Sequence, residues 1–163
     1  YSGEPITALD EGRPLLVRLP ESRMNLANFA RNLLYSAMAT LKIGMDILTD
    51  RENVRLETLL GHGGLFKTPL VGQRLMAGAL SVPVAVMETA GEGGPWGMAI
   101  LAAYMNNGRG EPLADYLARR VFADARSVAA APNAEDARGF AAFMERYRRC
   151  LAVERAAVVN LVR

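Results

Sequence analysis

The sequence predicts an α/β fold with short parallel strands, flanking helices and a long helix near the N-terminus. Residues 54–107 run strand, glycine-rich turn and helix twice in succession, an order typical of parallel pairing through right-handed crossovers. Residues 24–49 carry apolar side chains at helical spacing. The length of 163 residues suits one domain with a buried core, so residues 1–163 are expected to form a single domain.

Residues 1–23 are predicted to form a loop, because glycine and proline recur there, with a short strand at residues 15–19. Residues 24–49 are predicted to form the long helix. One apolar stripe of this helix contains Leu34, Met38, Leu41, Met45 and Leu48, and a second contains Leu26, Phe29, Leu33 and Ala37. A helix that is apolar on so much of its girth is expected to be well buried.

The first strand–turn–helix unit begins with a strand at residues 54–60 and continues into the turn GHGGLFKTP, residues 61–69. Thr68 and Pro69 form a good helix start, a hydroxyl N-cap followed by proline at the first helical position. That helix is expected to run to about Leu80.

The second unit has a strand at residues 82–87 and a second glycine-rich turn, TAGEGGPWG, at residues 89–97. Pro95 is expected to open a helix that Gly108 stops, with one face made by Met98, Leu101, Ala102 and Met105. Both glycine-rich turns then follow the carboxyl ends of parallel strands, which is the edge where open α/β sheets bind ligands.

The C-terminal third is predicted to be mainly helical. A short helix is expected at residues 112–121, and residues 122–132 are read as a brief third strand or coil. Asn133, with Asp136 three residues later, resembles a capping box. The final helix, residues 133–162, is expected to bury Phe140, Phe143, Tyr147 and Leu151.

The composition is that of an ordinary globular protein: 22% of the residues are charged and the net charge is +2. Such a balance implies neither a nucleic acid nor a membrane as partner. The single cysteine, Cys150, cannot form an internal disulfide, which favours a cytoplasmic location. No apolar run is long enough to span a bilayer. The chain opens on Tyr1 and not on methionine, so a piece of a longer protein is expected.

The turn GHGGLFKTP does not match the known phosphate-binding loops. A P-loop needs a glycine where Phe66 stands, directly before Lys67-Thr68, and the dinucleotide fingerprint fails at the same position. His62, the only histidine, has no ligand partners at metal spacing, and no nucleophile elbow exists. Glu88 and Glu92 are interpreted as a loop residue and a helix-start charge. We therefore assign no catalytic residue and no metal ligand.

Binding is the remaining functional interpretation of this turn. Gly63 and Gly64 lack a Cβ, so the backbone there can approach a flat or bulky ligand closely. Lys67 and Thr68 would lie at a helix start, whose free amides favour an anion or a polar edge. The alternative, a tight strand-to-helix corner without a ligand, is equally compatible with these residues.

The segment GHGGLFKTPLVGQRLMAGALSVPV resembles the part of FGGY-type carbohydrate kinases with a Gly-Gly pair, often Lys-Ser-Pro-Leu, a helix with Gln and a strand after Pro-Val. The next stretch, GPWGMAILAAYMNNG, is similar to that family's following helix, with Met98 where the family usually has alanine. Residues 11–48 resemble the arginine-then-long-helix segment of its xylulokinase-like and ribulokinase-like members, and the helix around Tyr147 resembles its C-terminal helix.

The resemblance implies that the chain is the C-terminal portion of the second actin-like (ribonuclease H-like) domain of an ATP-dependent sugar kinase. Such enzymes transfer the γ-phosphate of ATP to a ketose or polyol such as xylulose or ribulose. By this resemblance Gly63 and Gly64 would line the adenine and ribose side of ATP, with Lys67 and Thr68 nearby. Mg²⁺, the catalytic base and most sugar contacts are expected outside these residues, so the fragment alone is expected to be inactive.

Two further points stay open at this level. A non-catalytic actin-like module that binds nucleotide for a structural or regulatory role would carry the same two glycine-rich turns. The expected partners are ATP, a small sugar and the missing N-terminal domain of the same protein. The apolar helix at residues 26–48 leaves open a contact with that domain or with a second copy of the chain.

Overall fold

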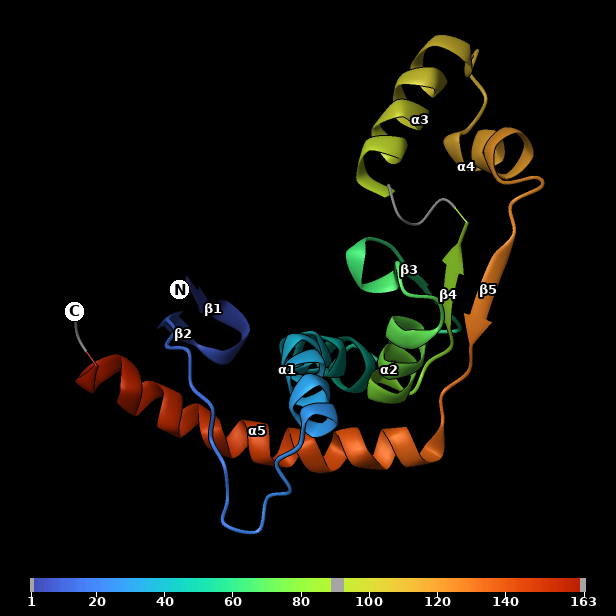
Figure 1. Ribbon diagram of the computed structural model, residues 1–163. Helices are drawn as coiled ribbons and strands as arrows, with labels where there is room; N and C mark the ends of the chain where they lie inside the picture. The colour runs from blue at the N-terminus through green and yellow to red at the C-terminus, as the bar shows by residue number, and fades with distance from the viewer. Residues whose placement is uncertain (1, 89–92, 162–163) are drawn as a thin grey trace. The chain divides into compact units, whose positions relative to one another are not determined.

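The computed structural model describes residues 2–88 and 93–161 (Figure 1). The chain forms two compact units. We call the first the helical unit; it contains Tyr1–Leu56, Gly78–Ser81 and Asn133–Arg163. We call the second the sheet unit; it contains Glu57–Ala77 and Val82–Pro132.

The helical unit is built on two long helices. Helix α1, Leu26–Asp46, begins at the N-cap Asn25, whose side chain accepts a hydrogen bond from the amide of Asn28. It continues into a π-helical turn, Ile47–Arg51. Helix α5, Ala134–Asn160, begins at Asn133, whose side chain accepts from the amides of Glu135 and Asp136 at 2.8 and 3.2 Å. The N-cap expected at Asn133 is thereby confirmed.

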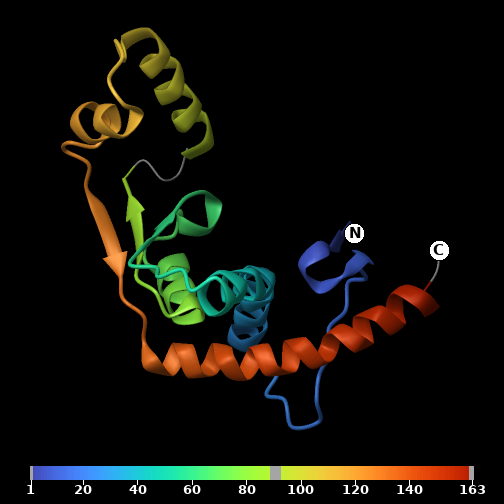
Figure 2. The same ribbon diagram turned by 180° about the vertical axis from the view of Figure 1, so that it is seen from behind.

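The core of this unit lies where α1 crosses α5 (Figures 1 and 2). The ring of Tyr35 on α1 meets the ring of Phe140 on α5 edge-on, with centroids 5.0 Å apart. Met38, Phe140 and Met144 are buried beside them, whereas the other aromatic residues expected in the core of α5 are only partly buried. Aromatic pairs of this kind stabilise a core beyond the area that they bury.

A small antiparallel hairpin precedes α1. Strands β1, Ser2–Glu4, and β2, Leu9–Glu11, are joined by a 3₁₀ turn at Pro5–Thr7. The loop prediction for residues 1–23 is therefore wrong at this point. The short strand expected at residues 15–19 is not formed, because a strand needs a partner and none of the described residues pairs with this segment.

The described residues of the sheet unit form three short strands in the order β3-β4-β5 (Figure 1). Strand β3, Leu59–Gly61, pairs in parallel with β4, Val84–Met87, and β4 pairs antiparallel with β5, Ser127–Ala130. The parallel pair confirms the α/β prediction in its coarse form. The first strand is shorter than predicted. A strand was expected at residues 54–60, but only Leu59–Gly61 pair with β4.

Helices α2, α3 and α4 connect the strands of this sheet in the chain. Helix α2, Val71–Leu80, lies between β3 and β4 in the chain. Helix α3, Gly93–Asn107, ends as predicted at Gly108, whose amide donates to the carbonyl of Tyr104 at 2.7 Å. Helix α4, Leu113–Tyr116, continues into a π-helical turn at Leu117–Val121, which together match the predicted short helix at 112–121. No helix among the described residues is both long enough and apolar enough to cross a membrane.

Two apolar helix faces lie on the outside, and for the first of them burial was expected. On α1, the stripe that contains Leu26 and Leu33 is exposed, so this helix is buried on one side only. On α3, the face with Met98, Leu101 and Met105 is also exposed. Periodicity shows that side chains share a face; it does not show that another element covers that face.

Candidate functional site

The candidate turn begins where β3 ends, at Gly61. A Cβ built on Gly61 would lie 2.6 Å from Cε1 and Cζ of Phe66, so the aromatic ring occupies the space that any side chain at 61 would need. Gly61 is itself buried. Phe66, which breaks the P-loop pattern, therefore has a structural role here: its ring closes the turn back onto the end of the strand.

The turn then opens at Gly63 and Gly64. Gly63 has φ 93° and ψ −169°, a conformation that L side chains rarely adopt, and it leads into a 3₁₀ turn at Gly64–Phe66. A Cβ at either glycine would meet no atom within 4 Å. The backbone of this glycine pair therefore faces open space, as a surface that receives a ligand closely must.

The helix start differs from the prediction. Helix α2 begins at Val71, and Thr68 is not its N-cap; the carbonyl of Thr68 instead accepts from the amide of Val71 at 3.3 Å. Leu70 precedes the helix with φ 65°, and its amide donates to Oε1 of Gln73 at 3.1 Å. Pro69 thus belongs to a turn before the helix. Lys67 and Thr68 are exposed beside the glycine pair.

Gln73 holds this turn; sequence reasoning noted it only as part of the family resemblance and gave it no role. Its side chain is 3% exposed. While Oε1 accepts from Leu70, Nε2 donates to the carbonyl of Val128 on β5 at 2.6 Å. Both ends of the amide are therefore used, which fixes the turn to the sheet. A glutamine within a largely apolar helix was the signal in the sequence that could have pointed to this role.

Gly72, next to Gln73, permits the close packing of the turn on α2. A Cβ there would lie 2.5 Å from the carbonyl oxygen of Leu65. The 3₁₀ turn at Gly64–Phe66 consequently lies directly against the first turn of the helix. The candidate residues Gly63, Gly64, Lys67 and Thr68 come together in this one short segment between β3 and α2.

The second glycine-rich turn follows β4 at the same edge of the parallel pair, since Gly61 is in register with Val86. Residues 89–92 of that turn, and with them Glu92, lie outside the described residues. Glu88 is exposed at the end of β4, and its amide donates to the carbonyl of Arg126 at 3.3 Å.

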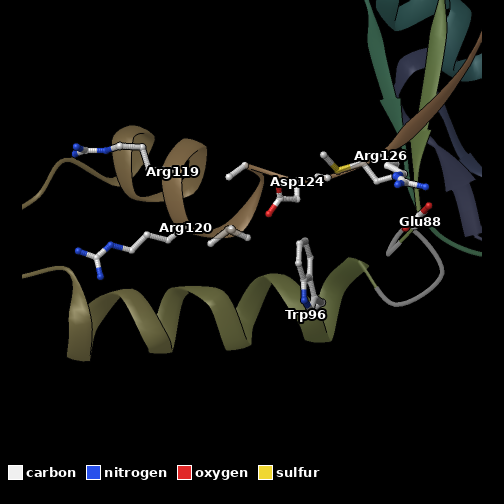
Figure 3. A pocket seen from close by; sticks show the side chains of 10 residues that line it. Glu88, Trp96, Arg119, Arg120, Asp124 and Arg126 are labelled. Atoms are coloured by element: carbon white, nitrogen blue, oxygen red, sulfur yellow. The ribbon is translucent and has the colours of Figure 1, made fainter.

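A pocket of about 310 Å³ lies beside this edge, within the sheet unit. Figure 3 shows Trp96 standing on the first turn of α3 below Asp124, with Glu88 and Arg126 close to each other near the end of β4. Trp96 packs against Phe122 with ring centroids 5.6 Å apart. The remaining residues that line the pocket are Met87, Arg119, Arg120, Val121, Ala123 and Ala125.

Two of the three arginines that line this pocket have partners elsewhere. Arg119 and Arg120 both pair with Glu111, and the guanidinium of Arg120 lies 5.6 Å from the ring centre of Tyr116. In Figure 3 both arginines point away from Trp96. The described lining of the pocket is therefore aromatic and mixed in charge.

Among the described residues, no three His, Cys, Asp or Glu side chains lie close enough together to hold a metal ion. In the helical unit, burial raises the pKa of Tyr147, and the charges of Glu4 and Glu154 raise it further.

Comparison with known proteins identifies the family. Residues 1–106 match the FGGY family of carbohydrate kinases, C-terminal domain. The chain belongs to the FGGY family. The match confirms the resemblance seen in the sequence, and it covers α1, the candidate turn, α2 and β4, whereas α4, β5 and α5 of this FGGY chain lie beyond it. No curated protein and no solved structure matches the chain.

Proposed function

We propose that this chain supplies a nucleotide-binding surface of an ATP-dependent carbohydrate kinase. The observation that carries the proposal is the Gly63-Gly64 pair, whose backbone faces open space at the carboxyl end of β3 in a member of a carbohydrate kinase family. The kinase transfers the γ-phosphate of ATP to a hydroxyl of a ketose or polyol such as xylulose or ribulose.

The proposed roles follow the geometry of the turn. Gly63 and Gly64 contact the flat nucleoside end of ATP, because no side chain intervenes between the ligand and the peptide plane. Lys67 and Thr68 lie beside them, where they would meet the polar edge of the nucleotide. Gln73 positions the turn through its two hydrogen bonds.

The residues present fit a nucleoside better than a metal ion. The open glycine pair suits a planar group, whereas the described residues offer no carboxylate cluster for Mg²⁺. Phosphoryl transfer depends on positioning and on charge stabilisation around the phosphates. We therefore propose that the metal ligands and the catalytic base belong to other parts of the kinase, and that this chain orients the nucleotide.

The finer assignment of the fold is also part of this proposal. Residues 1–163 are assigned to the C-terminal portion of a second, actin-like (ribonuclease H-like) domain, and the enzyme is assigned to the cytoplasm. The parallel β3–β4 pair with α2 between its strands supports such a domain.

The test uses the intact kinase with Gly64→Arg, because position 64 accepts a side chain without a steric clash. The arginine would occupy the surface proposed for the nucleoside. We expect the KM for ATP to rise at least about tenfold, a loss of about 1.4 kcal/mol of binding, with the KM for the sugar unchanged. The matched control is Ala118→Arg, which adds the same charge at an exposed position on the turn Leu117–Val121.

Two outcomes would contradict the proposal. If Gly64→Arg folds with an unchanged denaturation midpoint and an unchanged KM for ATP, the turn does not bind the nucleotide. If the intact protein binds ATP at this turn but phosphorylates none of a panel of pentuloses and polyols, the non-catalytic nucleotide-binding module replaces the kinase.

A further inference from the structure

The helical unit has a pocket of its own, with a volume of about 460 Å³. Three elements form its walls: the turn of the β1–β2 hairpin, the end of α1 with the π-helical turn that follows it, and α5. The volume is within the range of roughly 300–1,000 Å³ that small-molecule sites occupy. The residues that line the pocket are Ile6, Ile43, Asp46, Ile47, Asp50, Arg51 and Arg148.

Polar contacts fasten the three walls to one another. Asp46 at the end of α1 pairs with Arg148 of α5 at 3.0 Å, and it also pairs with Lys42. The hairpin is attached to α5 by Arg155, whose guanidinium donates to the carbonyl of Thr7 at 2.9 Å. The fold therefore forms this pocket without the help of a ligand, which lowers the entropic cost of binding one.

One part of the lining is apolar. Ile6, which is 39% exposed, comes from the hairpin, whereas Ile43 and Ile47 are partly buried on α1 and its π-helical turn. Residues four positions apart on a helix are neighbours on its surface, so Ile43 and Ile47 present one continuous patch. The three isoleucines together offer a surface that a hydrocarbon group can cover.

The π-helical turn supplies two charges that remain available. Among the described residues, neither Asp50 nor Arg51 has an ion-pair partner; Asp50 accepts a hydrogen bond from the hydroxyl of Thr49 at 2.9 Å. Consecutive positions on a helix do not face each other, so these two side chains are not expected to neutralise one another. Turns of π-helix are rare and occur frequently at functional sites.

The charge of the lining selects the kind of ligand. Its two aspartates and two arginines cancel formally, so a simple anion or a simple cation meets repulsion together with attraction. A metal ion is not favoured either, since no group of three possible ligands occurs among the described residues. A ligand that carries both charges can pair with both available groups.

We propose that this pocket binds a small zwitterion with an apolar side group, a free α-amino acid of the leucine or phenylalanine kind. The carboxylate of the ligand pairs with the guanidinium of Arg51 and its ammonium group with the carboxylate of Asp50. The hydrocarbon side group covers Ile6, Ile43 and Ile47. This site is separate from the glycine turn, and the proposal does not rest on the proposed nucleotide binding.

The test compares L-phenylalanine with two analogues that each lack one charge, L-phenylalaninamide and 3-phenylpropionate. Calorimetric titration of the intact protein at about pH 6, where the amide keeps its ammonium charge, measures the three dissociation constants. We expect L-phenylalanine to bind at least about tenfold more tightly than either analogue, because each analogue loses one charge-assisted contact.

Two variants assign the contacts. Arg51→Gln should weaken L-phenylalanine at least about fivefold and leave L-phenylalaninamide unchanged, since the amide has no carboxylate to lose. Asp50→Asn should weaken L-phenylalanine similarly and should not weaken 3-phenylpropionate. Both positions are exposed, so the variants are expected to fold. The matched control is Arg146→Gln, at an exposed position of α5 outside the lining, which should change none of the three constants.

Three outcomes would overturn the proposal. The first is that L-phenylalanine gives no heat of binding at concentrations up to about 20 mM. The second is that it binds but neither Arg51→Gln nor Asp50→Asn weakens it, so that it binds elsewhere. The third is that 3-phenylpropionate binds as tightly as L-phenylalanine, which would make the pocket a simple anion site. No measurement involves ATP or a sugar, so the result is independent of the proposed kinase function.

Discussion

The ring of Phe66 lies in the space that a side chain on Gly61 would occupy. The distance from a Cβ at position 61 to the ring would be 2.6 Å, well inside van der Waals contact. The end of β3 and the 3₁₀ turn are thus matched to each other: one residue has no side chain and the other has a large flat one. This match explains why a turn that resembles a P-loop has phenylalanine where the second glycine would be.

We expect Gly61→Ala to lower the free energy of unfolding by about 1–3 kcal/mol, since the added methyl overpacks a buried position. In the double variant Gly61→Ala/Phe66→Leu the smaller side chain at 66 should restore part of the loss. Urea denaturation of the four variants of this cycle measures the coupling energy. Additive effects of the two substitutions would show that the ring does not limit position 61.

Gly63 and Gly64 are expected to respond differently to the same substitution. Gly63→Ala meets no atom but must keep φ near 93°, so it should cost about 1–3 kcal/mol through backbone strain alone. Gly64→Ala has neither problem and should change the stability by less than about 0.5 kcal/mol. Thermal denaturation of the two variants makes the comparison. Equal losses would mean that the conformation at 63 is not the one that the fold requires.

Gln73→Leu should destabilise the sheet unit by about 2–4 kcal/mol. The apolar side chain removes both hydrogen bonds, and it leaves the amide of Leu70 and the carbonyl of Val128 without their partner. Gln73→Glu tests the second bond separately, because a carboxylate still accepts from Leu70 but cannot donate to Val128. Hydrogen exchange at the amides around residues 68–72 should accelerate in both variants; unchanged exchange would place the support of the turn elsewhere.

The raised pKa of Tyr147 predicts a loss of stability at high pH. The unfolded chain releases the tyrosine proton near its ordinary pKa of about 10, whereas the folded chain holds it to a higher pH because of burial and the neighbouring Glu4 and Glu154. The free energy of unfolding therefore falls as pH rises from the unfolded to the folded pKa, and it is unaffected below that window. Urea midpoints at pH 9 and 11 should fall further for the wild type than for Tyr147→Phe.

Local signals in the sequence predicted local structure well. The side chain of Asn133 and the missing side chain of Gly108 act within one helical turn, so composition alone located the start of α5 and the end of α3. The start of α2 could not be located in this way. Thr68 and Pro69 are residue types that favour a helix start. The side-chain amide of Gln73 instead accepts from the backbone amide of Leu70 and donates to β5, and the helix begins at Val71.

Burial and pairing depend on partners distant in sequence, and here prediction failed. The hairpin β1–β2 pairs Glu4 with Leu9, which the glycine and proline content of this stretch conceals. The stripe of α1 that contains Leu26 and Leu33 and the face of α3 around Met105 have the periodicity of buried surfaces and are nonetheless exposed. Their apolar character was predictable, whereas the identity of the covering element is not encoded in the helix itself.

The hydrogen bond from Gln73 to β5 has an evolutionary consequence. Its acceptor is the main-chain carbonyl of Val128, which every amino acid possesses, while the side chain of Val128 points into solvent. Substitutions along β5 can therefore accumulate without detaching the glycine turn, provided that the strand keeps its register. Relatives could differ widely after residue 106, where the family match ends, and still hold the turn in the same way.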